Sequence, residues 1–168
     1  MEHFNILLVD DSEEILKSLR RALKPEGYKI HTATSAKDAL TTLSRETIDL
    51  MITDESMPGG SGTELLKSVR ELFPDVIRIM LTGLKDLEIA KKAINNGEIY
   101  RFFNKPWDDF ELLISVRNAL RSKSLEKENA HLKSVCQQQQ ELLQQIEDEH
   151  PGITKKNMSD DGAYILDV

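Results

Sequence analysis

The sequence predicts a doubly wound, three-layer α/β fold built around a five-stranded parallel sheet. Short apolar runs alternate with segments of helical periodicity along residues 5–121, and no hairpin signal joins consecutive runs. Strands joined through helices pair in parallel by right-handed crossovers, and the helices then cover both faces of the sheet. Polar side chains follow several of the runs, so we expect these side chains to gather at one edge of the sheet.

The predicted strands are the apolar or alternating runs at 5–9, 28–32, 50–53, 76–81 and 99–103. The predicted helices carry apolar residues at helical spacing and lie at 15–23, 36–43, 61 or 63 to 72, 84–95 and from 107 onward. Ser12 and Ser35 are placed to cap the first two helices, because a serine oxygen accepts from the free amides of a first turn. Pro25, Pro74 and Gly97 end the first, third and fourth helices.

Composition excludes several classes of function. The chain has 168 residues, 39% of them hydrophobic, which suits one well-buried domain and an extension. Its net charge of −7 argues against direct nucleic-acid binding, which needs a basic face. A single cysteine excludes an intrachain disulfide framework and favours a reducing, cytoplasmic setting. No apolar run approaches the roughly 20 residues of a membrane span, so we expect no membrane partner.

The polar residues at the predicted strand ends are the candidate site. Asp10 and Asp11 follow the first run, Asp54 ends the third, Thr82 ends the fourth, and Lys105 follows the fifth. In an open parallel sheet, the loops at the carboxyl ends of the strands leave a crevice where ligands bind. The sequence therefore predicts three carboxylates, a hydroxyl and an ammonium group in one crevice.

These side chains together fit phosphoryl transfer to a carboxylate. Carboxylates that converge repel one another, and Mg²⁺ or Mn²⁺ would relieve the repulsion, because such cations prefer oxygen ligands. Lys105 offers a positive charge to phosphate oxygens, and the Thr82 hydroxyl offers a donor. We expect Asp54 to be the nucleophile, as in enzymes that form an aspartyl phosphate.

Each residue taken alone has a simpler structural explanation. Asp10 and Asp11 could cap the following helix, near the positive end of its dipole. Asp54 could be a turn residue before the Pro/Gly loop at 58–60, and Lys105 a solvated strand end. Independent turns have no reason to supply three acids and a lysine at neighbouring strand ends, so the combination favours a functional site.

The same residues resemble the receiver domain of bacterial two-component response regulators, of the chemotaxis-regulator type. The resemblance covers residues 4–121 and rests on Asp10-Asp11, Asp54, Met57-Pro58, Gly62, Thr82-Gly83 and Lys105-Pro106. It implies a flavodoxin-like sheet with strand order 2-1-3-4-5. It also implies that a sensor histidine kinase or a phosphotransfer protein phosphorylates Asp54. The chain would not be a conventional enzyme; at most it would take phosphate from small donors and lose it again.

The resemblance also assigns roles around the acceptor. It makes Asp11 the direct metal ligand of the acidic pair, places Asp10 behind a water molecule, and adds the backbone carbonyl of Ser56. Thr82 and Phe102 become switch residues that remodel the face formed by the fourth helix, fifth strand and fifth helix. Phe102 has no hydroxyl group, so it would switch by burial rather than by a phenolic hydrogen bond.

The C-terminal part has a different pattern, and we divide the chain into a receiver domain (1–121), a coiled-coil extension (122–150) and an acidic tail (151–168). No Pro or Gly interrupts residues 107–150, and beyond residue 122 the apolar residues narrow to a seam. The seam consists of Leu125, Asn129, Leu132, Cys136, Gln139, Leu143 and Ile146. Such a seam predicts a homodimer. We expect the tail to be flexible or to belong to an output region.

Two other functions remain open from the sequence. The chain could be a constitutive coiled-coil dimerisation module whose receiver fold works without phosphorylation. It could also be a hydrolase of the haloacid-dehalogenase type, which uses a nucleophilic aspartate after the first strand and another aspartate two residues later. Ser12 stands two residues after Asp10, which argues against the hydrolase.

Overall fold

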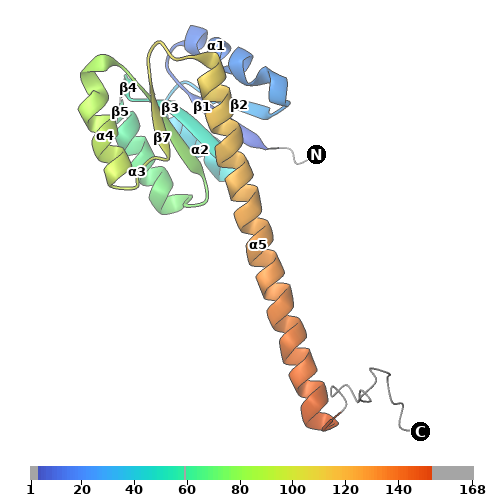
Figure 1. Cartoon of the computed structure of the whole chain (residues 1–168). Helices are drawn as coiled ribbons and strands as arrows, with labels where there is room; N and C mark the ends of the chain where they lie inside the picture. The colour runs from blue at the N-terminus through green and yellow to red at the C-terminus, as the bar shows by residue number, and fades with distance from the viewer. Residues whose placement is uncertain (1–3, 59, 153–168) are drawn as a thin grey trace. The chain divides into compact units, whose positions relative to one another are not determined.

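A computed structural model describes residues 4–58 and 60–152 (Figure 1). The parallel sheet consists of β2 (Lys29–Ala33), β1 (Asn5–Val9), β3 (Leu50–Asp54), β6 (Ile77–Thr82) and β7 (Arg101–Asn104), in that spatial order. Because β4 and β5 lie outside this sheet, β6 and β7 are its fourth and fifth strands in chain order. The structure therefore confirms the predicted α/β fold and the predicted 2-1-3-4-5 strand order. Because β1 and β3 are neighbours in the middle of the sheet, the acidic residues at their ends become neighbours as well.

Helices cover both faces of the sheet, as the alternation predicts. They are α1 (Glu13–Leu23), α2 (Ala36–Arg45), α3 (Gly62–Leu72), α4 (Leu87–Asn95) and α5 (Asp109–Glu149), with short 3-10 turns η1 (Lys24–Glu26) and η2 (Leu84–Asp86). Ser12 and Ser35 cap α1 and α2 as predicted. Ser61 and Glu64 form a reciprocal capping box at the start of α3. The cap fixes the position of α3 relative to the loop that follows Asp54.

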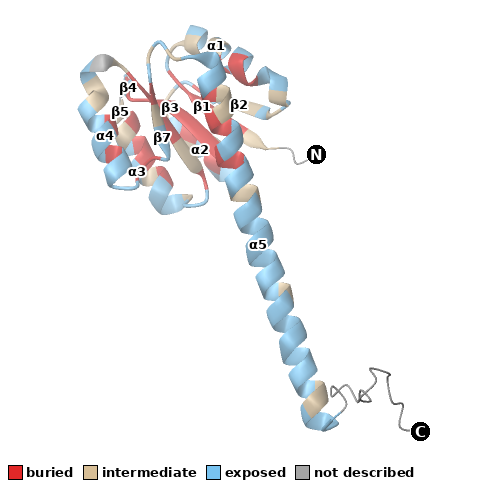
Figure 2. Ribbon diagram, viewed as in Figure 1, coloured by how far each residue is buried: buried red, intermediate tan, exposed pale blue. Residues whose placement is uncertain are grey.

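Two apolar clusters lie on opposite faces of the sheet. One joins the sheet to α2, α3 and α4, and the other joins it to α1 and the first turns of α5. Every residue of β3 is buried, and Leu50, Met51 and Ile52 are fully buried (Figure 2). Burying a side chain of this size stabilises a fold by about 1.5–3 kcal/mol, so the strand that carries Asp54 is firmly anchored.

The structure corrects the predicted boundaries and adds one element. Strands β2 and β6 begin one residue later than predicted, and β7 begins at Arg101 rather than at residue 99. Strand ends shift in this way because local pattern does not fix pairing. Strands β4 (Ser56–Met57) and β5 (Gly60–Ser61) form a short antiparallel ladder in a loop for which no hairpin was predicted.

The chain divides into two compact units, Met1–Ser122 and Lys123–Val168. In the second unit, α5 continues without a break to Glu149, and its surface is largely exposed (Figure 2). Among the described residues, no helix is long and apolar enough to cross a membrane. Most of the predicted acidic tail, residues 153–168, lies outside the described part of the chain.

Candidate functional site

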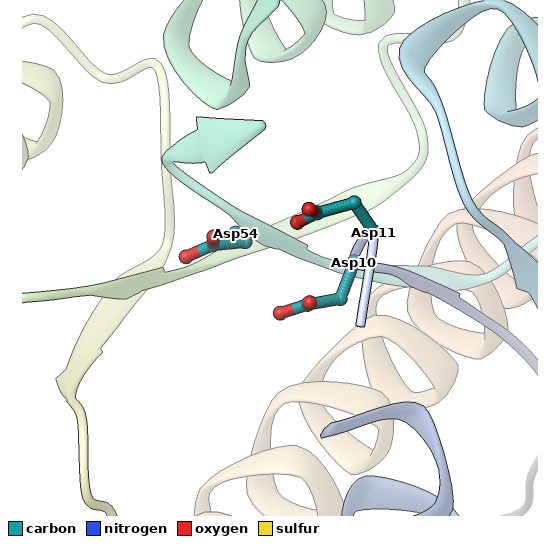
Figure 3. A group of neighbouring side chains, drawn as sticks. All are labelled: Asp10, Asp11 and Asp54. Atoms are coloured by element: carbon teal, nitrogen blue, oxygen red, sulfur yellow. The ribbon is translucent and has the colours of Figure 1, made fainter. Parts of the chain in front are cut away.

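Three carboxylates converge at the carboxyl ends of β1 and β3. Asp10 and Asp11 directly follow β1, and Asp54 is the last residue of β3. One oxygen atom from each carboxylate can be chosen so that all three lie within 4.8 Å of one another. In Figure 3 the three side chains extend to the same side of the strands. Asp10 and Asp54 are buried, whereas Asp11 is exposed to solvent.

Lys105 reaches into this cluster from the end of β7. Its Nζ atom lies 3.0 Å from Asp10 Oδ2 and 2.9 Å from Asp54 Oδ1. The Lys105 amide donates a 2.8 Å hydrogen bond to the carbonyl of Thr82, which ties the end of β7 to the end of β6. The ammonium group therefore bridges the two buried carboxylates.

The surroundings shift the pKa values of this ion pair. Burial raises the pKa of Asp54, and the charge of Asp10 adds to the rise, while Lys105 acts in the opposite direction. Burial by itself would lower the pKa of Lys105. Hydrogen bonds and charges from Asp54 and Asp10 outweigh that effect, so the pKa of Lys105 is raised. Lys105 is therefore cationic at neutral pH and offsets negative charge in the crevice.

The predicted hydroxyl and switch residues lie on the neighbouring strands. Thr82, the last residue of β6, is fully buried, and its hydroxyl donates to the carbonyl of Gly83 at 3.1 Å. Phe102 lies on β7 beside Met80 and packs, partly buried, against the cluster on the α2–α4 face. The structure thus brings Asp10, Asp11, Asp54 and Lys105 together. It places Thr82 and Phe102 on the strands that border them.

Ser56 and Asp86 connect two loops above the sheet. Ser56 is exposed on β4, and its hydroxyl donates a 3.1 Å hydrogen bond to the Asp86 carboxylate, which lies immediately before α4. Sequence reasoning named only the backbone carbonyl of Ser56 and missed Asp86. No spacing signal identifies Asp86, because the contact joins residues thirty positions apart.

Glu55 is a further buried acid that the sequence did not reveal. Its carboxylate accepts from the Thr63 amide at 2.9 Å and from the Thr63 hydroxyl at 2.8 Å. Burial raises the pKa of Glu55, although the bonds from Thr63 act against the rise. Glu55 anchors the first turn of α3, so it holds the loop in place and does not belong to the carboxylate cluster. No local pattern marks Glu55, because its partner Thr63 lies eight residues further along the chain.

Gly62 is required for the loop to pass behind Asp54. A Cβ atom at this position would lie 2.1 Å from the carbonyl oxygen of Asp54, far inside van der Waals contact. The Gly62 amide also donates a 2.8 Å hydrogen bond to the carbonyl of Glu55. Any side chain at Gly62 would therefore displace the backbone that positions Asp54.

The donor set fits a hard divalent cation. Mg²⁺ binds oxygen ligands, needs only one or two protein carboxylates and retains several water molecules. The convergent oxygens of Asp10, Asp11 and Asp54 supply such ligands, and exposed Asp11 leaves one side of the cluster open to solvent. Within the described residues, no histidine or cysteine belongs to the cluster, which favours Mg²⁺ or Mn²⁺ over zinc.

Comparisons with known proteins agree with this geometry. The family model of the response regulator receiver domain matches residues 6–117. The chain is 36% identical, over 121 residues, to the hydrogenase transcriptional regulatory protein HoxA of Cupriavidus necator; the match covers 72% of this chain and 25% of that protein. It is 34% identical to the C4-dicarboxylate transport transcriptional regulatory protein DctD of Pseudomonas aeruginosa, covering 82% of this chain and 29% of that protein. The chain thus spans less than a third of either relative.

Solved structures of isolated receiver domains are similar over most of their length. The signal receiver domain of an HD domain-containing protein from Pseudomonas fluorescens Pf-5 is 43% identical with a TM-score of 0.70, and the match covers 76% of this chain and 94% of that chain. A response regulator receiver domain protein from Clostridium thermocellum is 32% identical with a TM-score of 0.68, covering 73% and 98%. The strand ends described above lie within residues 6–117, which the family model matches.

Proposed function

We propose, from the premise that the chain belongs to the response regulator receiver domain family, that Asp54 is the residue through which it accepts a phosphoryl group in two-component signalling. The observation that supports this assignment most strongly is the bridge of Lys105 between Asp54 and Asp10. A buried carboxylate among other carboxylates can receive an anionic phosphoryl group only where a nearby positive charge offsets the negative charges. Lys105 supplies such a charge beside Asp54. Of the two carboxylates that Lys105 contacts, Asp54 is the one that ends the buried strand β3.

The chain's own residues position the transfer. An Asp54 oxygen forms a bond to phosphorus while the bond from phosphorus to the donor nitrogen of a phosphohistidine breaks, and that nitrogen keeps the electron pair and takes up a proton. Lys105 compensates the phosphoryl charge from the side of β7. The Thr82 hydroxyl turns from the Gly83 carbonyl to donate to a phosphoryl oxygen. Such transfer depends on positioning and charge stabilisation more than on covalent chemistry by the protein.

Asp10, Asp11, Asp54 and the backbone carbonyl of Ser56 would hold Mg²⁺. When bound, the ion supplies positive charge that offsets the repulsion between the carboxylates and the incoming phosphoryl group. Asp11 is the accessible member of the group, so it would hold the cation on the side that is open to solvent.

The response would pass to the face formed by α4, β7 and the first turns of α5. Apolar side chains are exposed on or beside these elements, at Ile89, Ile94, Tyr100 and Phe110. Movement of Thr82 toward a phosphoryl group acts on β7 directly, because the Thr82 carbonyl accepts the Lys105 amide. Phe102, partly buried on β7, would change its burial and alter this face. A partner protein that responds to the phosphorylated state would dock on this face.

The test is the stable uptake of a phosphoryl group from acetyl phosphate in the presence of Mg²⁺, measured by intact mass. The wild-type chain is expected to gain one phosphoryl group, and Asp54→Asn is expected to gain none. Asp75→Asn is the matched control, because Asp75 is an exposed acid before the opposite end of β6. Uptake by Asp54→Asn at the wild-type level would refute the assignment.

A further inference from the structure

The α5 extension exposes large apolar side chains that a folded chain normally buries. Leu125 and Leu132 are each 55% exposed, Leu142 is 56% exposed and Leu143 is 54% exposed. They recur along one continuous helix, and Figure 2 shows that its surface is almost entirely exposed. A narrow apolar seam on a helix this long is typical of a coiled coil and cannot be buried by the helix itself.

Two heptad assignments are compatible with the spacing of these leucines, and the residues between them decide which seam is buried. If Leu125, Leu132, Gln139 and Ile146 occupy the d positions of the heptad, the a positions are Asn129, Cys136 and Leu143. If they instead occupy a, the d positions become Glu128, Val135, Leu142 and Glu149. The second arrangement buries two carboxylates in the seam, which carries a large desolvation cost. The first buries none, so it is the seam that a partner covers.

We propose that a second copy of this chain covers this seam as a parallel, in-register coiled coil. In that arrangement, each seam residue meets its own counterpart. Asn129 of one copy hydrogen-bonds to Asn129 of the other, and the Gln139 amides pair in the same way. A polar pair of this kind at an a position fixes register and favours two parallel strands. This proposal does not depend on which residue accepts phosphate.

The alternative antiparallel arrangement pairs unlike residues. With the two seams fully overlapped, Cys136 would face Gln139, and Asn129 would face the apolar side chain of Ile146. The Asn129 amide would then lose its partner in the seam. A buried amide without a hydrogen-bond partner is costly, so the polar residues of the seam favour the parallel arrangement.

Charges beside the seam favour the same arrangement. In the parallel dimer, Glu128 at a g position lies beside Lys133 at the following e position of the other copy, twice by symmetry. In the antiparallel arrangement, Glu126 would lie beside Glu147 and Glu128 beside Glu149, again twice each. The parallel dimer therefore has two pairs of opposite charges beside the seam, whereas the antiparallel dimer has four pairs of like charges. A second copy is therefore the partner that matches both the seam and its flanks.

Cysteine cross-linking tests the seam and its direction in the full chain. The native Cys136 is expected to form a disulfide-linked dimer on mild oxidation, because it lies in the seam. The matched control combines Cys136→Ser with Ser134→Cys, which moves the only cysteine to an outward f position. The native chain should cross-link at least about tenfold faster than this control, because a disulfide requires Cβ atoms about 4 Å apart.

A second pair of variants separates the two directions. In the Cys136→Ser background, Asn129→Cys places the thiols side by side in a parallel dimer but about 25 Å apart in the antiparallel one, at 1.5 Å of rise per residue. Ala130→Cys is the control at an outward b position. Rapid cross-linking of Asn129→Cys alone supports the proposal. The proposal would be overturned if the two variants cross-link at equal rates, or if the native chain cross-links through Cys136 but the Asn129→Cys variant does not. It would also be overturned if the chain sediments as a monomer at high protein concentration.

Discussion

The acidic site and the α5 extension differ in where their side chains find partners. At the site, buried charges are matched within one chain, because Lys105 contacts both Asp10 and Asp54. On the extension, apolar side chains such as Leu125 and Leu132 remain more than half exposed. Satisfied polar groups indicate a site that a single copy builds, whereas exposed apolar groups indicate a surface that is completed by another molecule. The two regions should therefore respond independently to substitution.

The largest effect is expected at Gly62. Gly62→Ala forces a Cβ atom against the carbonyl of Asp54, so we expect it to lower the free energy of unfolding by about 3 kcal/mol. It should also slow phosphorylation, because the backbone of Asp54 must shift. Gly60→Ala is the control in the same loop, where a Cβ atom meets nothing closer than 4.0 Å. Chemical denaturation of both variants makes the comparison, and equal stabilities would show that the close contact at Gly62 is relieved without strain.

Removal of the lysine should have the next largest effect. Lys105→Met leaves Asp10 and Asp54 without their cationic partner, and we expect the free energy of unfolding to fall by about 2 kcal/mol in metal-free buffer. This figure is below that of a fully buried pair, because the Lys105 side chain is 26% exposed. Mg²⁺ should restore part of the loss by replacing the missing charge.

Lys17→Met provides the contrast for Lys105→Met. Lys17 pairs with Glu13 on the surface of α1, where both side chains are more than three-quarters exposed. Its substitution should change the free energy of unfolding by less than about 0.5 kcal/mol. If the two variants lose the same stability, or if Mg²⁺ has no effect on Lys105→Met, the lysine does not bridge the carboxylates in solution.

A charge in the seam should affect the extension alone. Leu132→Asp is expected to weaken self-association by at least about tenfold, because it removes a buried leucine and adds a carboxylate. Phosphorylation of Asp54 by acetyl phosphate should be unchanged. Ser134→Asp adds the same charge at an outward position and should leave the dimer intact. Sedimentation with and without beryllofluoride also distinguishes a phosphate-regulated dimer from a constitutive one. A constitutive dimer should have the same dissociation constant in both conditions.

The smallest effect is expected for the bond between the two loops. Asp86→Ala removes the acceptor of the Ser56 hydroxyl, an exposed contact, so the free energy of unfolding should change by no more than about 0.5 kcal/mol. Thermal unfolding of Asp86→Ala beside Ser56→Ala measures it. The non-additive part of the loss in the double variant measures this bond, and a strictly additive loss would show that the two side chains do not interact in solution.

Sequence reasoning predicted the sheet and the residues at its ends because both follow from local pattern. Apolar runs followed by Asp10, Asp54 and Thr82 predict the strands, and parallel pairing brings their ends to one edge. The strand order itself was implied by the resemblance to receiver domains, and the structure confirms it. The long helix was predicted in the same way, since no Pro or Gly interrupts it.

Contacts between distant loops could not be predicted from the sequence. The bond from Ser56 to Asp86, the burial of Glu55 beneath Thr63 and the β4–β5 ladder all depend on how the chain returns over the sheet. Propensity gives no distance between such segments, whereas tertiary packing sets it. The close approach of Gly62 to Asp54 is of the same kind, because a glycine in sequence does not reveal which backbone atom it must pass.

The fluorescence of Trp107 tests the central claim most directly. It is the only tryptophan, it follows Lys105-Pro106, and its indole donates to Asp109 at 3.0 Å at the start of α5. Beryllofluoride, which imitates a phosphoryl group, should change this fluorescence only when Mg²⁺ is present and only when residue 54 is aspartate. A response that is the same in EDTA, or the same in Asp54→Asn, would contradict a magnesium-dependent phosphoryl acceptor at Asp54.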